Sequence, residues 1–229
     1  MKYTYLLINF FTLLFPLALS FDKKVAFYKK WKFLWPGLVI TGIVFLFWDV
    51  LFTVDGVWSF NPKYTIGINI LQLPVEEILF FLTVPFACTF IYACLNYYMK
   101  REMDMRLTRI ISNVVIILCI LVLIFYHHQL YTRVTFTLVA FLVILLQFIY
   151  KARWLNRFYM AFLVALVPFY IINGILTSLP VVVYNNAQNM GMRLYTIPVE
   201  DHSYLAALLL MNIGFYEYFR AKKSNLYHA

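Results

Sequence analysis

The chain has 229 residues, of which 64% are hydrophobic and only 13% are charged. A soluble domain is about half apolar and about a quarter charged, so this composition excludes an ordinary soluble protein and indicates an integral membrane protein. The net charge of +9 does not indicate a nucleic-acid-binding protein, because the basic residues are clustered between apolar segments in a way that matches membrane topology and attraction to anionic lipid.

Seven apolar segments are each about 20 residues long, the length that an α-helix needs to cross a bilayer. They predict spans at 4–21, 34–53, 75–98, 110–127, 132–150, 158–178 and 200–219. The first segment looks like a secretory signal peptide, but no small-x-small cleavage site follows and the next loop is strongly basic. We therefore interpret it as a retained span.

Fifteen of the 19 basic residues lie in the segments that follow the first, third, fifth and seventh spans. The four others are Lys2, Lys63, Arg133 and Arg193. This positive-inside bias predicts an N-terminus outside and a cytoplasmic C-terminus, in the inner (cytoplasmic) membrane of the cell. Cys88, Cys94 and Cys119 lie inside spans without metal-binding or disulfide spacing, so we interpret them as small buried hydrophobic residues.

A shift of 124 positions aligns one half of the sequence with the other. It places LPVEE (residues 73–77) on IPVED (residues 197–201), and spans one to three on spans five to seven. The unmatched fourth span lets both units face the same way. We therefore predict an all-α membrane protein of seven transmembrane helices, with two parallel three-helix repeats related by a pseudo-twofold axis along the membrane normal. The predicted units are 1–99, a linker with the fourth span at 100–131, and 132–229.

Each repeat has a proline and two acids at the start of a span: Glu76 and Glu77, then Glu200 and Asp201. One copy alone would indicate only a helix start, because proline and acids suit the first turn. Two copies at a fixed offset favour a functional site, since ionisable groups at membrane depth are costly. A carboxyl group held away from water has a raised pKa and can act as a general acid, although the helix dipole opposes this.

Other polar and aromatic residues gather on the same predicted side of the membrane. Asp49 ends the second span and Asn173 holds the matching place in the sixth. Arg193 is either a rim charge or the ion-pair partner of one acid, and the aromatic residues form either an interfacial belt or a wall that stabilises a cation. The candidate substrate-binding or cation-stabilising residues are Asp49, Trp48, Trp58, Phe60, Asn61, Phe80, Asn173, Tyr184, Asn185, Arg193, Tyr195 and Tyr204.

The segment WDVLFTVDGVWSFNPKYTIGINILQLPVEEILFF (48–81) resembles the first half of the integral-membrane lycopene cyclases, and NGILTSLPVVVYNNAQNMGMRLYTIPVED (173–201) resembles the second half. This family occurs as two small subunits or as one fused chain, and the present chain resembles the fused form. The resemblance implies an intramolecular lyase or isomerase that closes β-rings on lycopene, giving β-carotene via γ-carotene without net redox.

In that reaction a carboxylic acid protonates the terminal C1=C2 bond, the C5=C6 bond attacks the cation at C1, and a base removes a proton from C6. The resemblance implies that Glu76, Glu77, Glu200 and Asp201 carry these proton steps. It leaves open which acid is the donor and which is the base. Because Asp49 matches Asn173 and Glu77 matches Asp201, it also leaves open whether there are two sites or one shared site.

The implied partners are lycopene taken from the bilayer, membrane lipids and other enzymes of the carotenoid pathway, without nucleic acid. We expect no cofactor and no metal, because the reaction only moves protons and the sequence lacks a G-x-G-x-x-G turn.

The main alternative is a proton-coupled membrane carrier of a small or lipophilic solute, which would also use a parallel repeat and buried acids. The spans have few glycine breaks, however, and the acids lie near one side of the membrane. A retinal photoreceptor would need a lysine in 200–219, and a prenyltransferase would need aspartate-rich clusters; the sequence has neither. A receptor or assembly subunit should tolerate Glu→Gln in both repeats.

Overall fold

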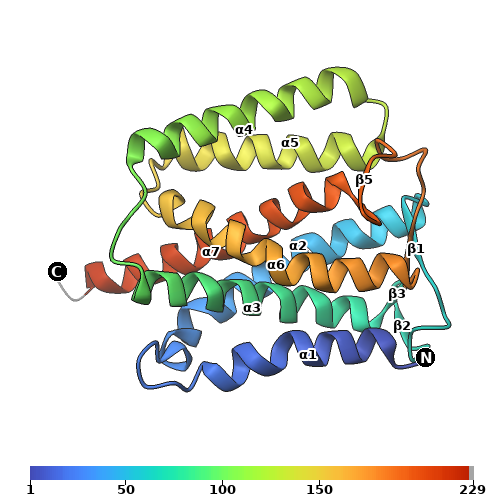
Figure 1. The fold of residues 1–229 in the computed structure, drawn as a ribbon, viewed down its shortest axis with the longest axis horizontal. Helices are drawn as coiled ribbons and strands as arrows, with labels where there is room; N and C mark the ends of the chain where they lie inside the picture. The colour runs from blue at the N-terminus through green and yellow to red at the C-terminus, as the bar shows by residue number, and fades with distance from the viewer. Residues whose placement is uncertain (227–229) are drawn as a thin grey trace.

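The computed structural model describes residues 1–226, with side chains up to residue 223. In this part of the chain seven α-helices run roughly side by side (Figure 1). They are α1 (Thr4–Leu19), α2 (Trp31–Val54), α3 (Val75–Tyr98), α4 (Met105–Tyr126), α5 (Leu130–Ile144), α6 (Leu155–Ser178) and α7 (Val199–Leu226). A 3-10 helix, η1 (Phe27–Lys30), leads into α2, and a π-helical turn, η2 (Leu145–Ile149), continues α5. Consecutive helices alternate in direction, so the N-terminus and the end of α7 lie at opposite ends of the bundle.

Within residues 1–226, five helices are long and apolar enough, by length and composition, to cross a membrane. They are Phe27–Val54, Val75–Tyr98, Met105–Tyr126, Leu130–Ile149 and Leu155–Ser178. The helix α1 is apolar but has only 16 residues, whereas α7 has 28 residues and carries acids in its first turn and a lysine in its last. The chain is therefore a mostly helical membrane protein, and the arrangement of seven spans as two repeats stays a prediction.

The helices lie close to the positions expected from the apolar segments. The largest differences are at α4, which begins at Met105 instead of residue 110, and at α7, which ends at Leu226 instead of residue 219. Both extensions contain polar and basic residues, so a prediction based on apolar length leaves them out of the helix. Helices continue past the apolar region because each added residue gains a backbone hydrogen bond.

Six short strands lie in the two long loops, which the prediction of an all-α fold does not include. The first loop holds β1 (Trp58–Phe60), β2 (Asn69–Ile70) and β3 (Leu73–Pro74), and the second holds β4 (Val182–Tyr184), β5 (Arg193–Leu194) and β6 (Ile197–Pro198). All pairs are antiparallel: β2 with β3, β5 with β6, and β1 with β4 across the two loops. The pairing arises because backbone N–H and C=O groups in a partly buried loop need partners.

The β1–β4 contact is reciprocal. Asn61 N–H donates to the Val181 carbonyl at 2.9 Å, and Asn185 N–H donates to the Val57 carbonyl at 2.9 Å. The shift of 124 positions exchanges these two bonds. Such an exchange of partners is what a twofold relation between the two loops produces.

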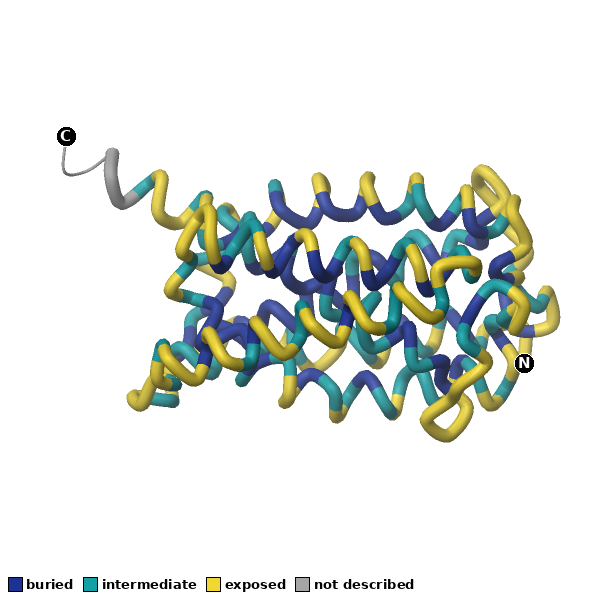
Figure 2. Tube along the Cα trace, turned by 90° about the horizontal axis from the view of Figure 1, so that it is seen from above, coloured by how far each residue is buried: buried dark blue, intermediate teal, exposed yellow. Residues whose placement is uncertain are grey.

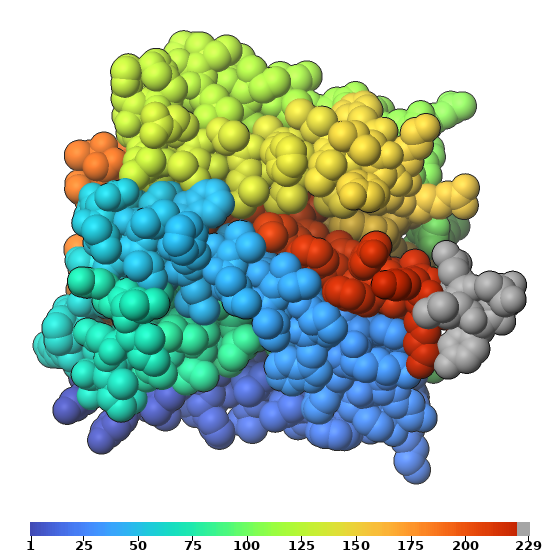
Figure 3. Space-filling view, turned by 180° about the vertical axis from the view of Figure 1, so that it is seen from behind, coloured from blue at the N-terminus to red at the C-terminus, as the bar shows by residue number. Residues whose placement is uncertain are grey.

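The apolar core lies mainly between α2, α3, α5, α6 and α7. Figure 2 shows buried segments facing inward and exposed residues on the outer faces and loops. Figure 3 shows α2 crossing one face beside α7. Gly37 permits this approach, because a Cβ atom there would lie 2.9 Å from the Cβ of Phe215. Large apolar side chains on the outer faces, such as Phe47 and Leu163, are exposed, which suits contact with lipid.

Candidate active site

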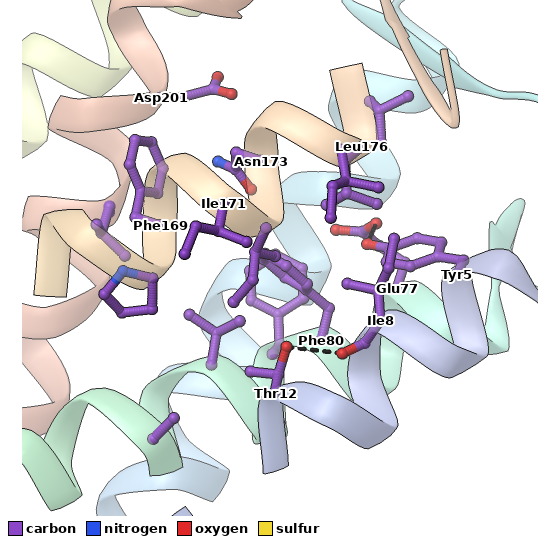
Figure 4. A pocket seen from close by; sticks show the side chains of 18 of the residues that line it. Tyr5, Ile8, Thr12, Glu77, Phe80, Phe169, Ile171, Asn173, Leu176 and Asp201 are labelled. Carbon is purple, nitrogen blue, oxygen red and sulfur yellow. Dashed lines mark hydrogen bonds between the residues drawn. The ribbon is translucent and has the colours of Figure 1, made fainter. Parts of the chain in front are cut away.

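A cavity of about 650 Å³ lies between α1 and α6, with α3 and α7 also contributing to its walls (Figure 4). Its lining follows α1 from Thr4 to Pro16 and is largely apolar. Phe11 of α1 and Ile171 of α6 line the cavity and are also exposed on the outer surface of the bundle. The cavity therefore opens sideways between two helices, where a membrane protein meets lipid.

The second acid of each duplicated motif faces this cavity. Glu77 at the start of α3 and Asp201 at the start of α7 both line it, together with Asp49 near the end of α2. All three side chains are buried. Electrostatic interactions link Glu77 to both Asp49 and Asp201. Three carboxyl groups from three helices thus share one mostly apolar space.

The first acid of each motif points elsewhere and holds a loop. Glu76 Oε1 accepts the backbone N–H of Ile66 at 2.7 Å, and Glu200 Oε1 accepts that of Met190 at 2.7 Å. Both acids are completely buried, and neither lines the cavity. Consecutive helix residues point about 100° apart, which explains how neighbouring acids reach different surroundings.

Buried tyrosines donate hydrogen bonds to the two motif acids in the cavity. The Tyr5 hydroxyl of α1 donates to Glu77, and the Tyr131 hydroxyl of α5 donates to Asp201 Oδ1 at 2.7 Å. The Tyr184 hydroxyl of β4 donates to Asp201 Oδ2 at 2.8 Å. Burial and the nearby Asp201 carboxyl raise the pKa of Tyr184 well above its ordinary value, so this phenol keeps its proton and remains a donor.

Sequence reasoning missed Tyr5 and Tyr131, although each is completely buried. The two tyrosines are 126 positions apart, whereas the other matched positions are 124 apart. The ungapped comparison therefore places Tyr5 opposite Gln129. A comparison that allowed a two-residue gap between the first and second spans of a repeat would have found the pair.

The cavity wall near Asp49 is aromatic. Trp58 makes edge contacts with Tyr131 and Tyr204, with ring centroids 5.1 and 6.1 Å apart. Tyr204 also meets the edge of Phe45, with centroids 5.1 Å apart. Ring faces in such a wall can stabilise a cation that forms beside them.

The two related halves differ most in this wall. Trp48 and Phe52 of α2 make an edge contact, with ring centroids 5.8 Å apart, and pack with Tyr131 and Tyr204 where α2, α5 and α7 meet. The shift of 124 positions matches these rings with smaller side chains: Trp48 with Ile172, Phe52 with Leu176, and Trp58 with Val182. The smaller side chains of α6 leave the space that forms the cavity, whereas rings fill the related place beside α2.

The structure brings nine of the sequence-predicted residues to the cavity. They are Asp49, Trp58, Phe60, Glu77, Phe80, Asn173, Tyr184, Asp201 and Tyr204. It places Glu76, Glu200, Trp48, Asn61, Asn185, Arg193 and Tyr195 outside the cavity lining.

The predicted residues outside the cavity have contacts of their own. Asn61 and Asn185 each accept, through Oδ1, the N–H of the residue two positions later, at 3.1 and 3.0 Å, which fixes a turn. Tyr195 is 91% exposed in the turn between β5 and β6. Arg193 donates to Asn186 Oδ1 at 2.8 Å, and within the described residues it forms no ion pair with an acid. Arg193 therefore makes no direct ion pair among these residues, but its charge acts on the Asp201 carboxyl group, and its role as a charge partner of one acid stays a prediction.

The fold and the cavity together define a helical membrane protein with a lipid-facing apolar site that contains three carboxylic acids. A family model for lycopene cyclases matches residues 2–95 and 128–219. These two stretches make up most of the chain, and α4 lies in the gap between them. The chain belongs to the lycopene cyclase family. No curated protein and no solved structure matched the chain.

Proposed function

We propose that the chain is a lycopene β-cyclase of carotenoid biosynthesis, an intramolecular lyase or isomerase that makes β-carotene from lycopene via γ-carotene. The observation that carries this proposal is the cavity, in which Asp49, Glu77 and Asp201 meet an apolar, partly aromatic wall. Membership of the lycopene cyclase family supports the assignment of a carotenoid substrate.

The shape of the cavity suits a hydrocarbon taken from the bilayer. Its mouth lies between α1 and α6, and residues there, such as Phe11 and Ile171, are exposed on the outer face of the bundle. The lining from Thr4 to Pro16 follows about 18 Å of helix, because each helical residue rises about 1.5 Å. An extended polyene could lie along α1 with its end group beside the acids.

Glu77 and Asp201 are the motif acids that we assign to the proton steps. A carboxyl group in the cavity protonates C2, the C5=C6 electron pair closes the C1–C6 bond, and a carboxylate takes the proton from C6. One proton enters and one leaves, so ring closure needs no net redox. Both Asp201 oxygens accept tyrosine hydroxyls, an arrangement suited to a base.

Glu76 and Glu200 take a different role in this proposal. They hold the loops that precede α3 and α7 through the backbone N–H groups of Ile66 and Met190. Those loops carry Trp58 and Tyr184 to the cavity. We therefore assign the first acid of each motif to positioning and the second to proton transfer.

The proposed topology retains the N-terminus outside and the C-terminus in the cytoplasm, in the inner membrane, because the basic segments lie at the end of the bundle away from the strands. The proposed units remain 1–99, 100–131 and 132–229. Lycopene and membrane lipids are the proposed partners, with association with other carotenoid-pathway enzymes as a further proposal.

The proposal is tested by expressing the chain in bacteria that accumulate lycopene and separating the carotenoids by chromatography. Wild type should form β-carotene, and Glu77→Gln should leave lycopene at equal protein level. Glu217→Gln is the matched control, because Glu217 is an acid on α7 bound to Tyr92 at 2.9 Å, away from the cavity; it should cyclise normally. Unchanged lycopene with well-inserted wild-type protein would contradict the proposal and favour the carrier.

A further inference from the structure

Among the residues that the structure describes, three polar groups of the cavity wall have a buried atom without a hydrogen-bond partner. They are Asp49 Oδ2, Trp58 Nε1 and the Tyr204 hydroxyl. The Trp58 indole lies near the Asp49 carboxyl without reaching hydrogen-bond geometry. Buried polar atoms are nearly always paired, so a cluster of exceptions in one cavity needs an explanation. Groups that are satisfied only when a substrate is present would provide one.

Asp49 differs from the other two cavity acids in its surroundings. Glu77 accepts the Tyr5 hydroxyl, and Asp201 accepts those of Tyr131 and Tyr184. Asp49 is 1% exposed, and its Oδ2 receives no donor from the described part of the chain. A carboxylate only accepts hydrogen bonds, whereas a protonated carboxyl group has an O–H to give. A carboxyl group with one buried oxygen that accepts no hydrogen bond is therefore suited to carry a proton on that oxygen and to release it to a bound molecule.

We infer that Asp49 is the residue that delivers the proton to the substrate double bond, an assignment that rests on the proposed cyclase function. The Asp49 O–H bond breaks as the new C2–H bond forms, and C1 becomes the cation. The C5=C6 pair forms the C1–C6 bond and leaves the positive charge on C5. Asp201 takes the proton from C6, and the electrons of that C–H bond restore the C5=C6 double bond.

Before the next turnover Asp201 has to lose this proton and Asp49 has to gain one, and both steps take place by exchange with water. Glu77 interacts electrostatically with both of these residues and is hydrogen-bonded to Tyr5. We assign Glu77, the third carboxyl group of the same cavity, to this proton exchange. All three acids are then used in one cycle, and the site ends in the state in which it began.

The assignment also gives the duplicated scaffold a single proton donor. The shift of 124 positions matches Asp49 with Asn173, which lines the same cavity. An amide side chain does not serve as a carboxylic acid does in this step. One donor serves one end of the substrate at a time, so the two rings must form in separate events.

The test compares wild type, Asp49→Asn and Asp49→Glu with Thr41→Val as the matched control. Thr41 lies on the same helix about two turns earlier; it is completely buried with an unpartnered Oγ1, but it is outside the cavity lining. Each protein is supplied with lycopene in vesicles, and ring formation is followed by chromatography. Bound lycopene is measured on the purified protein by its absorption spectrum.

Asp49→Asn should lower the rate of ring formation by about 10²-fold or more, the usual contribution of a general acid, while lycopene still binds. Asp49→Glu should restore part of the rate, and Thr41→Val should match wild type. An Asp49→Asn protein that cyclises at the wild-type rate would overturn the assignment, and so would one that no longer binds lycopene. Wild type that forms no rings would instead refute the proposed function, and the assignment with it.

Discussion

The loops before α3 and α7 are built almost alike, whereas the walls beside them are not. In both loops a buried glutamate accepts the N–H of the residue ten positions earlier, and reciprocal bonds join β1 to β4. The walls differ because rings such as Trp48 in one half correspond to smaller side chains such as Ile172 in the other. The shared loop scaffold holds the acids, and the divergence of the walls makes room for a substrate.

The cavity also draws its chemistry from both halves. Asp49 and Glu77 come from the first and Asp201 and Tyr204 from the second. A site assembled in this way does not need two identical copies. The comparison of the halves therefore favours one shared site. Variants at matched positions of the two halves test this conclusion.

The largest effect is expected at Asp201. Asp201→Asn should lower ring formation by about 10²–10⁴-fold, because a positioned acid or base contributes that much. Protein abundance and the midpoint of thermal unfolding in detergent should stay near wild type. Comparable loss in the Tyr195→Phe control, whose side chain is exposed in a turn, would show that this end of the protein is merely sensitive to change.

A loss on the order of 10²-fold is expected from Ile172→Trp, since displacing a substrate by about 1 Å can have an effect of that size. The substitution gives α6 the ring that α2 carries at Trp48 and fills the cavity. Val167→Trp on the exposed face of the same helix should retain activity. Retention of lycopene by both proteins, measured from their absorption spectra, would argue that the substrate does not occupy this cavity.

Replacing Glu76 or Glu200, the acids that hold the two loops, should lower the stability of the fold more than the rate of ring formation per folded protein. Glu76→Ala and Glu200→Ala should each lower the free energy of unfolding by about 1–3 kcal/mol for every donor left unpaired. Glu200→Ala should be the worse of the two, because Glu200 Oε1 also accepts the Thr132 hydroxyl at 2.6 Å. Denaturation in detergent measures the free energy of unfolding of both variants. Equal losses in the two variants would contradict the stronger anchoring that we assign to Glu200.

The smallest effects are expected from Tyr5→Phe and Tyr131→Phe. Each removes one hydroxyl that donates to a cavity acid and should destabilise the fold by about 0.5–1.5 kcal/mol, the usual net contribution of one hydrogen bond. Tyr131→Phe should be milder in its effect on the acid, since Asp201 keeps its bond from Tyr184. The rate of ring formation per folded protein measures this difference. A larger loss of rate in Tyr131→Phe than in Tyr5→Phe would contradict it.

The sequence predicts much of this arrangement. Apolar length locates the helices, and the 124-residue shift identifies the matched loops and the acids. Helix periodicity predicts that Glu76 and Glu77 point in different directions. Which of them faces the cavity depends on the preceding loop, whose Ile66 N–H binds Glu76 from ten residues away, and the sequence pattern does not show this contact. The β1–β4 pairing and the role of Tyr5 are missed for a similar reason, because they depend on contacts between the halves or on a shifted register.

The measurement that tests the account most directly is ring formation in heavy water, with mass spectrometry of the carotenoids after many turnovers. Proton delivery by an exchangeable acid followed by loss of a carbon-bound proton predicts one deuterium for each ring closed. The label should appear in γ-carotene first and then twice in β-carotene, and both products should form about 10²–10⁴-fold more slowly in Asp201→Asn. Unlabelled rings, or rings formed at the wild-type rate in that variant, would contradict acid–base cyclisation in this cavity.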